Sequence, residues 1–125
     1  MILIDSSLWY EYYEGSKYSF YVEKIIKNMG NVLVPTIIIV EIFKKLITVT
    51  NQDNALKFIA QMKKGEISDL DFDLSLIAAF WGKEYKLPLA DSIIYATALK
   101  FNAEIYTLDK HFKGLKNVKY FEKLN

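Results

Sequence analysis

The sequence predicts a three-layer α/β/α domain with a central, mostly parallel five-stranded sheet. Three observations lead to this fold class. Short apolar runs alternate along the chain with longer segments whose apolar residues recur every three or four positions. The 125 residues suffice for one domain with a substantial core, and no stretch has the composition of a linker, so one domain is expected over residues 1–125. Because strands separated by helices pair in parallel through right-handed crossovers, helices should cover both faces of the sheet.

The five expected strands are short runs with apolar residues. They lie at residues 1–5 (MILID), 31–35 (NVLVP), 66–71 (EISDLD), 103–109 (AEIYTLD) and 118–124 (VKYFEKL). The third run is the weakest, because it contains only two apolar residues. Pro35 is compatible with the end of the second run, where the chain leaves the sheet.

Six helices are expected between these strands. They cover residues 8–13, 17–29, 35–50, 51–65, 72–86 and 87–101. Ser6 or Ser7 can cap the first helix, and Gly30 can end the second. The third is contestable, because its β-branched start, TIIIV, also suits a strand. The spacing of Ile38, Ile42 and Leu46 favours a helix.

Composition excludes several classes of protein. No apolar run approaches the roughly 20 residues that span a bilayer, and the first residues lack the basic region of a signal peptide. The chain has no Cys, which excludes disulfides, thiol catalysis and thiolate metal sites and makes the cytoplasm the expected location. The net charge is only +1, and every basic side chain other than His is Lys, so bidentate Arg recognition of phosphate or guanine is excluded.

Four acidic residues occupy positions that the predicted fold can bring together. Asp5 ends the first strand, Asp109 ends the fourth, Asp91 begins a strongly apolar helix and Glu41 lies inside the third helix. Ligands of such sheets bind beyond the carboxyl ends of the strands. Two charges 4 Å apart repel by about 4 kcal/mol at an effective dielectric constant near 20. A hard divalent cation, Mg²⁺ or Mn²⁺, would relieve that repulsion and account for a carboxylate in an apolar helix.

Each of these acids also has an ordinary structural explanation. Asp5 could cap the first helix, and Asp91 could face the positive end of its own helix dipole. Glu41 could pair with a lysine three or four residues later, and Asp109 could be a turn residue. These explanations are adequate singly, but they leave the common placement of the four acids unexplained.

The stretches LIDSSLW, VPTIIIVEIFKKL and LPLADSIIYATALKFNAEIYTLDKHFKGL resemble, in order and spacing, the acidic motifs of PIN-domain ribonucleases. The likeness is greatest to the small VapC-type toxins of VapBC toxin–antitoxin pairs. It implies a PIN-like fold and an Mg²⁺- or Mn²⁺-dependent endoribonuclease that leaves a 5′-phosphate. It also implies that Asp5, Glu41, Asp91 and Asp109 bind the metal, with Ser6 and Thr107 as supporting hydroxyls.

The resemblance further implies an RNA substrate, a small DNA-binding antitoxin that inserts a basic residue into the acidic pocket, and a homodimer. Many relatives place Arg near these motifs, where this chain has Lys44 and Lys45. Lys110 and Lys113, which follow Asp109, are candidate RNA contacts. Two alternative functions remain at this point: a non-catalytic interaction module on a PIN-like fold, and a receiver-like α/β domain.

Three other features have a structural or surface interpretation. The acidic run DLDFD (residues 69–73) straddles a strand end and a helix start, where acids act as caps. His111 is the only histidine, so no paired-histidine ribonuclease mechanism is available, and it is expected on the surface or near the phosphate. Tyr10, Tyr12 and Tyr13 cannot all point inward from one short helix, so we expect them to supply a surface for self-association or for the antitoxin.

Overall fold

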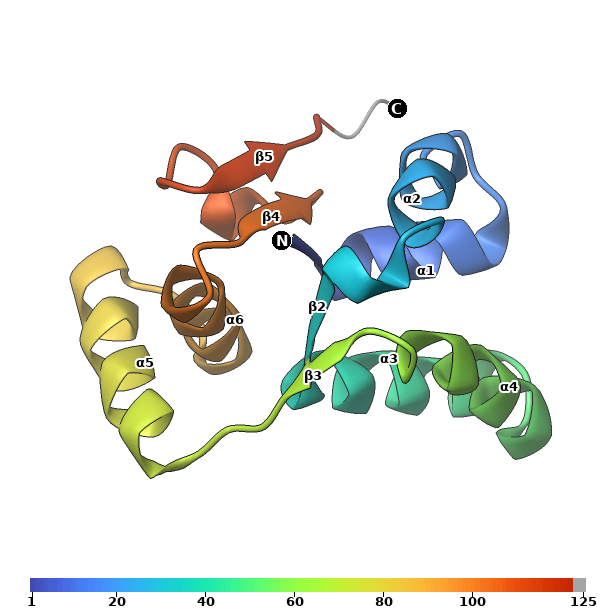
Figure 1. Cartoon of the computed structure of the whole chain (residues 1–125), viewed down its shortest axis with the longest axis horizontal. Helices are drawn as coiled ribbons and strands as arrows, with labels where there is room; N and C mark the ends of the chain where they lie inside the picture. The colour runs from blue at the N-terminus through green and yellow to red at the C-terminus, as the bar shows by residue number, and fades with distance from the viewer. Residues whose placement is uncertain (123–125) are drawn as a thin grey trace.

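A single parallel sheet organises the protein. The computed structural model describes residues 1–122, and its sheet has the strand order β3-β2-β1-β4-β5 with every neighbouring pair parallel (Figure 1). The strands are β1 (Ile2–Ile4), β2 (Val32–Pro35), β3 (Glu66–Ser68), β4 (Glu104–Thr107) and β5 (Val118–Tyr120). All five strands were predicted. The last was expected to reach residue 124, but it ends at Tyr120, and residues 123–124 lie outside the described part of the chain.

Within residues 1–122, six α-helices cover the sheet and complete the three-layer α/β/α fold. They are α1 (Ser6–Glu14), α2 (Ser19–Ile26), α3 (Thr36–Val49), α4 (Gln52–Met62), α5 (Phe72–Tyr85) and α6 (Leu89–Lys100). Two short 3₁₀ turns, η1 (Met29–Asn31) and η2 (Lys110–Phe112), precede β2 and β5. In Figure 1, α5 lies at the outer edge of the molecule and packs mainly on α6. Within residues 1–122, no helix has the length and apolarity needed to cross a membrane.

The second helix is shorter than its apolar spacing predicted. It was expected over residues 17–29, but α2 begins at Ser19 and ends at Ile26. Its start is delayed because the hydroxyl of Ser16 accepts a hydrogen bond from the Tyr18 amide and holds a turn there. Its end comes early because Asn28 leaves the helical region (φ −123°, ψ 77°) and starts the turn into β2. Local turns at both ends therefore shorten the helix relative to the apolar pattern.

The β-branched stretch after Pro35 is helical, as its longer-range spacing predicted. Pro35 closes β2 in an extended conformation and stands at the N-cap of α3. Ile38, Ile42 and Leu46 then recur every fourth residue and are fully or almost fully buried. The core requires this apolar stripe, so packing of one helix face outweighs the β preference of the individual residues.

The strand order creates a topological switch point at β1, where the connections to the neighbouring strands lead to opposite sides of the sheet. β1 is central, and its neighbours β2 and β4 lie on opposite sides of it. The Asp5 amide donates to the Tyr106 carbonyl over 3.0 Å, so pairing between β1 and β4 continues to the last residue before α1. Side chains that follow these two strands are thereby placed at the carboxyl edge of the sheet, where parallel α/β folds bind their ligands.

Candidate active site

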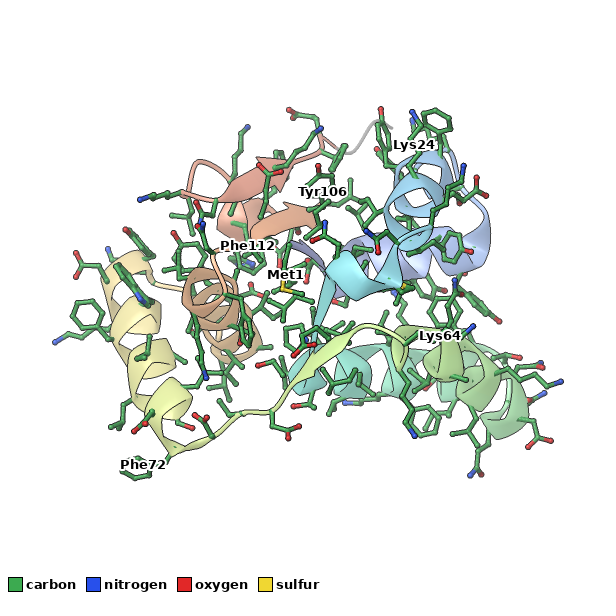
Figure 2. All side chains as sticks on the ribbon, viewed as in Figure 1. Met1, Lys24, Lys64, Phe72, Tyr106 and Phe112 are labelled. Carbon is green, nitrogen blue, oxygen red and sulfur yellow. The ribbon has the colours of Figure 1, made fainter. Side chains whose placement is uncertain are left out.

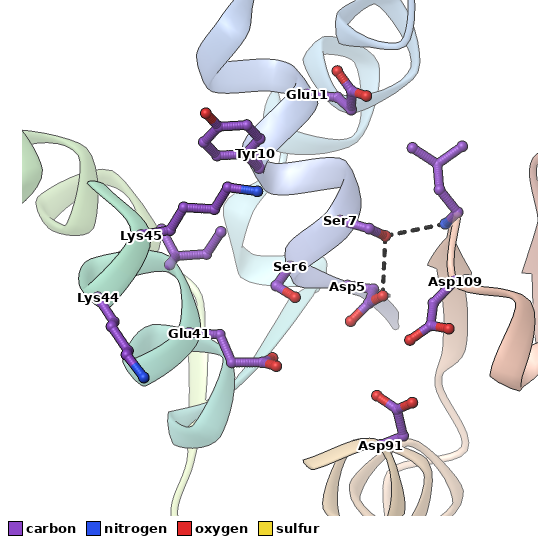
Figure 3. A pocket seen from close by; sticks show the side chains of 12 residues that line it. Asp5, Ser6, Ser7, Tyr10, Glu11, Glu41, Lys44, Lys45, Asp91 and Asp109 are labelled. Atoms are coloured by element: carbon purple, nitrogen blue, oxygen red, sulfur yellow. Dashed lines mark hydrogen bonds between the residues drawn. The ribbon is translucent and has the colours of Figure 1, made fainter. Parts of the chain in front are cut away.

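The four predicted acidic residues converge on one open pocket of about 670 Å³. Asp5 comes from the end of β1, Asp109 from the end of β4, Asp91 from the first turn of α6 and Glu41 from α3. Figure 3 shows the four carboxylates directed toward a common centre, with Ser6 between the side chains of Asp5 and Glu41. Residues separated by up to 104 positions in the sequence therefore form one acidic site.

Asp5 is held rigidly by two hydroxyl groups. It is 2% exposed, and its Oδ2 accepts hydrogen bonds from Thr107 Oγ1 at 2.7 Å and from Ser7 Oγ at 3.0 Å. Asp5 occupies the N-cap position of α1, but its side chain makes no capping hydrogen bond. The capping explanation is therefore insufficient for Asp5, whose carboxylate is directed to the strand ends instead.

The same two hydroxyls join the ends of β1 and β4. Thr107 Oγ1 accepts from the Asp109 amide at 2.8 Å, and Ser7 Oγ accepts from the Leu108 amide at 3.0 Å. Each hydroxyl thus donates to Asp5 while it fixes the backbone of the segment that carries Asp109. Supporting groups of this kind orient the charged residues of a site and tune their chemistry.

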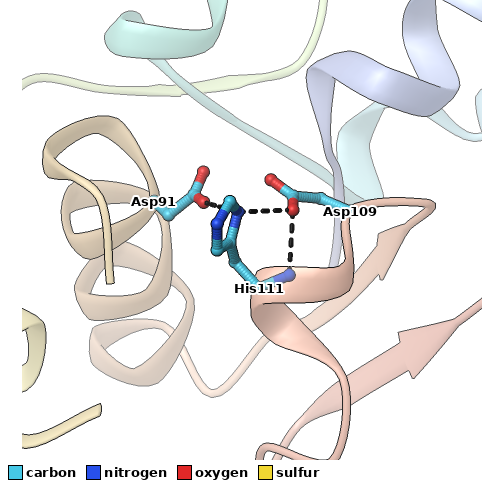
Figure 4. Close-up of side chains that lie close together, drawn as sticks. All are labelled: Asp91, Asp109 and His111. Carbon is cyan, nitrogen blue, oxygen red and sulfur yellow. Dashed lines mark hydrogen bonds and ion pairs between the residues drawn. The ribbon is translucent and has the colours of Figure 1, made fainter. Parts of the chain in front are cut away.

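His111 lies between Asp91 and Asp109 (Figure 4). Its Nδ1 is 2.8 Å from Asp109 Oδ1 and 3.3 Å from Asp91 Oδ2. The His111 amide also donates to Asp109 Oδ1 at 2.9 Å, so Asp109 caps the short turn η2. Asp91, Asp109 and His111 each offer one ligand atom within 4.8 Å of the others, which is a spacing suited to a metal ion.

Burial and mutual repulsion disfavour the charged form of these carboxyl groups. Burial, followed by the nearby charge of Asp109, raises the pKa of Asp91 to about 8. Burial is the main cause that raises the pKa of Asp5, against the opposing hydrogen bonds of Thr107 and Ser7. Burial also raises the pKa of Glu41, with a smaller contribution from the charge of Asp5. The site therefore holds carboxylates that need a further source of positive charge when ionised.

Glu41 shows this need most directly. Its Oε1 is buried, and within residues 1–122 no donor hydrogen-bonds to it. Neither Lys44 nor Lys45 pairs with it in that part of the chain, although both line the pocket. The Lys45 ammonium instead stands 3.7 Å from the centre of the Tyr10 ring. A surface pair with lysine is therefore insufficient to explain Glu41.

The donor set suits a hard divalent cation. Carboxylate oxygens predominate, as Mg²⁺ and Mn²⁺ prefer, and the one adjacent nitrogen is the imidazole of His111. The unpartnered oxygen of Glu41 and the raised pKa of Asp91 both identify sites where a cation would restore the missing compensation. The residues present therefore fit the metal that the sequence predicted.

Of the other predicted site residues, the two hydroxyl residues lie at the acidic pocket and the two lysines do not. Ser6 lines the pocket and Thr107 contacts Asp5, whereas Lys110 and Lys113 do not line the pocket. Sequence reasoning missed Ser7 and the close contacts of His111. Ser6 and Ser7 both follow Asp5 in the run DSS, and the sequence alone does not show which of the two hydroxyls contacts the Asp5 carboxylate.

The central residue of the acidic run at residues 69–73, Asp71, caps a helix. Asp71 caps α5, because its Oδ1 accepts a hydrogen bond from the Leu74 amide at 2.8 Å. Its Oδ2 lies 3.8 Å from the ammonium of Lys100. The interpretation of this run as a helix cap is confirmed for Asp71.

Comparison with known families agrees with this geometry. The sequence model of the PIN domain matches residues 2–118, which is nearly the whole chain. The chain belongs to the PIN domain family. No curated protein matches the sequence significantly.

Solved structures share the PIN fold of this chain. A chain of a toxin–antitoxin complex from Klebsiella pneumoniae has a TM-score of 0.81 and 21% identity, covering 95% of this chain and 96% of that chain. A chain of VapBC2 from Rickettsia felis bound to a promoter DNA fragment has a TM-score of 0.75 and 16% identity, covering 98% and 100%. A chain of DNA-bound VapBC from Salmonella typhimurium has a TM-score of 0.71 and 12% identity, and the match covers 97% of this chain and 98% of that chain. At these identities the likeness establishes the fold.

Proposed function

We propose that this PIN domain is an Mg²⁺- or Mn²⁺-dependent endoribonuclease and the toxin of a VapBC-type toxin–antitoxin pair. The convergence of Asp5, Glu41, Asp91 and Asp109 on one pocket, with a buried oxygen of Glu41 left without a donor, is the observation that supports catalysis most strongly. Four carboxylates that merely stabilised the fold would be satisfied by protein donors.

Each group in the pocket has a defined part in this chemistry. When bound, the metal would lower the pKa of a coordinated water and neutralise charge that develops on the phosphate oxygens. Asp5, Glu41, Asp91 and Asp109 would hold it. Thr107 and Ser7 keep Asp5 in one orientation, and their bonds to the backbone keep Asp109 in place.

The pocket lysines supply positive charge to one side of the acidic centre. Lys44 and Lys45 line the pocket from α3, next to Glu41. An RNA backbone that enters with one phosphate at the acidic centre would place a neighbouring phosphate near these ammonium groups. Lys110 and Lys113 remain candidate contacts for RNA outside the pocket.

A cleavage assay tests the function. The purified chain, incubated with a mixture of structured and unstructured RNAs, should cleave only with Mg²⁺ or Mn²⁺ and leave 5′-phosphate ends. Chelator should stop the reaction, and a preparation of the Asp91→Asn variant made in parallel controls for contaminating ribonuclease. Absence of cleavage across these RNAs, with metal bound, would favour the non-catalytic interaction module instead.

The partner is proposed to be a small DNA-binding antitoxin, with the toxin itself a homodimer. The structural neighbours come from toxin–antitoxin complexes, two of them bound to DNA. An antitoxin that inserts a basic residue into the acidic pocket would replace the charge of the metal and stop cleavage. A short gene for a DNA-binding protein directly upstream would support this assignment. A toxin of this kind would act on RNA in the cytoplasm.

The receiver-like alternative is excluded by the sheet. Receiver domains have the strand order 2-1-3-4-5. Here the order is 3-2-1-4-5, and the family match is to the PIN domain.

A further inference from the structure

The imidazole of His111 contacts two acidic residues that belong to different elements. Its Nδ1 lies 2.8 Å from Oδ1 of Asp109, which follows β4, and 3.3 Å from Oδ2 of Asp91, in the first turn of α6. Within residues 1–122, no lysine forms an ion pair with either carboxylate. In that part of the chain, His111 is therefore the one basic side chain that holds these two acids in relation to each other.

The backbone fixes the position of this ring. The turn η2, which carries His111, is capped by Asp109, whose Oδ1 accepts a hydrogen bond from the His111 amide at 2.9 Å. The Phe112 amide donates to the Asp109 carbonyl at 3.2 Å, and the Phe112 side chain is fully buried in the core, near the middle of the molecule in Figure 2. The side chain of His111 is exposed. The turn therefore places the ring, whereas the core does not depend on the ring for packing.

Only one oxygen of each carboxylate contacts His111. Nδ1 approaches Oδ1 of Asp109 and Oδ2 of Asp91, and in Figure 4 the second oxygen of each carboxylate points away from the ring. Both residues also line the acidic pocket, where Figure 3 shows their carboxylates directed toward the common centre of the site. The second oxygens are thus the ones available to a cation that binds among the acids.

The orientation of an aspartate carboxylate needs support of this kind. Rotation about the terminal bond of an Asp side chain is broad and roughly two-fold, so an unsupported carboxylate samples many orientations. A cation that binds two carboxylates has to restrict both rotations at a cost in conformational entropy. Because His111 already restrains one oxygen of Asp91 and one of Asp109, that cost is lowered before the metal binds. Mg²⁺ gains most, since it requires near-octahedral ligand geometry.

The contacts of Nδ1 are those of a donor nitrogen rather than of a metal ligand. A distance of 2.8 Å between a ring nitrogen and a carboxylate oxygen is typical of a charge-assisted hydrogen bond. Such a donor carries hydrogen on Nδ1, and a ring nitrogen that carries hydrogen has no lone pair to offer a metal. The His111 amide donates to the same oxygen, so Asp109 Oδ1 is occupied by two donors. A metal would then bind the opposite oxygen of Asp109.

We propose that His111 is a positioning residue of the metal site: its imidazole holds Asp91 and Asp109 through one oxygen each, so that their other oxygens face the same cation. The ring acts through these two acids and does not itself bind the metal. The inference rests on the proposed function, because it assumes the Mg²⁺ or Mn²⁺ ion that this function requires. Its tests measure metal binding and the ring itself, so they are independent of the cleavage assay.

Two substitutions of His111 separate its hydrogen bonds from the bulk of its ring. His111→Leu removes the donor but keeps a side chain of moderate size, and it should weaken Mn²⁺ binding, measured by calorimetry, by about 10–100-fold. His111→Asn places an amide nitrogen close to the position of Nδ1 and should keep most of the parent's affinity. Both variants should show native circular dichroism, because the side chain that they replace is exposed.

The outcomes distinguish this inference from the proposed function. If the parent binds Mn²⁺ and His111→Leu binds it as tightly, the two acids are positioned without the ring, and this inference alone fails. If His111→Asn loses as much affinity as His111→Leu, the donated hydrogen bonds are not what supports the metal, and the inference again fails alone. A parent that binds no Mn²⁺ would overturn both the inference and the metal-dependent function.

Nitrogen NMR tests whether the ring itself binds the metal. His111 is the only histidine of the chain, so histidine labelled with the heavy nitrogen isotope gives one pair of ring signals. In the parent saturated with Mg²⁺, the chemical shift of Nδ1 should be that of a nitrogen that carries hydrogen, whether the ring is neutral or charged. A shift typical of a ring nitrogen without hydrogen, appearing at Nδ1 when Mg²⁺ is added, would make His111 a ligand and overturn the positioning role.

Discussion

The Nδ1 atom of His111 lies 3.3 Å from Oδ2 of Asp91, a carboxyl group almost buried in the first turn of an apolar helix. The same nitrogen contacts Asp109, so one imidazole bridges two of the four acids. It is the nearest protein group that can offset the charge of Asp91. The side chain of His111 is 57% exposed, however, and within residues 1–122 Oε1 of Glu41 still has no hydrogen-bond donor. The site is thus only partly compensated by the protein itself.

Replacement of Asp91 by Asn should separate catalysis from stability. We expect cleavage of RNA to fall by more than about a hundredfold if Asp91 binds the metal as proposed, because loss of a direct ligand costs more than loss of a supporting group. In chelator, the melting temperature should rise at pH 7, because Asn needs no proton to be neutral in this pocket. Both are measured on the same preparation, by gel assay and by circular dichroism.

Asp71→Asn is the matched control for this change. Asp71 caps α5, and Asn is an equally good cap, so both activity and melting temperature should stay at the parent's values. An Asp91→Asn variant that cuts RNA at the parent's rate would remove Asp91 from the site. An effect of Asp71→Asn on metal-dependent cleavage would instead place function at the acidic run that precedes α5.

The stability of the metal-free protein should fall as pH rises. Asp91 has a pKa of about 8 in the folded protein against 3.8 as its ordinary value, so the folded state holds a proton that the unfolded chain releases. Stability then decreases with pH through the window from about 4 to about 8, since the folded state binds more protons there. Asp5 and Glu41, whose pKa values are also raised, act in the same direction.

Comparison of the parent with Asp91→Asn isolates this effect from the other carboxyl groups. The difference in melting temperature, measured in chelator by circular dichroism from pH 4.5 to 8.5, should grow with pH and level off near pH 8. A difference independent of pH would show that Asp91 keeps an ordinary pKa in the folded protein. Saturating Mg²⁺ should reduce the parent's loss at high pH, because the metal requires ionised ligands.

Much of this site followed from the sequence because strand ends carry positional information. Once β1 and β4 were located, Asp5 and Asp109 had to lie at the same edge of a parallel sheet. Asp91 was conspicuous because a carboxylate rarely interrupts an apolar helix without a partner. The α/β order and the helical fate of residues 36–49 followed from periodicity over several turns, which averages out the preferences of single residues.

The parts that sequence missed depend on contacts between distant segments. Ser7 contacts the segment that follows β4, and His111 of η2 contacts Asp91 of α6. The residue type and position of a single side chain in the sequence do not reveal such contacts.

The association surface expected at Tyr10, Tyr12 and Tyr13 stays a prediction. The spacing within α1 did not reveal that Tyr12 and Tyr13 also contact Phe58 of α4. The exposure of Phe72, Leu76 and Phe80 on α5 was not predicted either, because apolar spacing does not show which face of a helix is covered.

Mg²⁺ or Mn²⁺ should raise the melting temperature of the parent. A ligand that binds only the folded state stabilises it by about 2.7 kcal/mol at a hundred times its dissociation constant, which corresponds to several degrees for a domain of this size. The shift should disappear in a variant with Asp5→Asn and Asp109→Asn together. Persistence of the full shift in that variant, measured by scanning calorimetry, would place the ion elsewhere in the protein.

Thr107 offers the sharpest test of how the site is supported. It is fully buried, donates to Asp5 and accepts from the Asp109 amide, so Thr107→Val removes both contacts with almost no change in volume. We expect a loss of about 1–3 kcal/mol in unfolding free energy, because a buried carboxylate and an amide lose partners. Affinity for Mn²⁺, measured by calorimetry, should weaken by about 10–100-fold.

Thr107→Ser keeps the hydroxyl and loses only a methyl group, which makes it the conservative control. It should bind Mn²⁺ nearly as tightly as the parent and lose about 1 kcal/mol in stability from the missing methyl. If Thr107→Val and Thr107→Ser weakened Mn²⁺ binding equally, the effect would come from packing. If Thr107→Val kept the parent's affinity for Mn²⁺, Asp5 would be oriented without the help of Thr107, and the hydrogen bond at 2.7 Å would serve the fold alone.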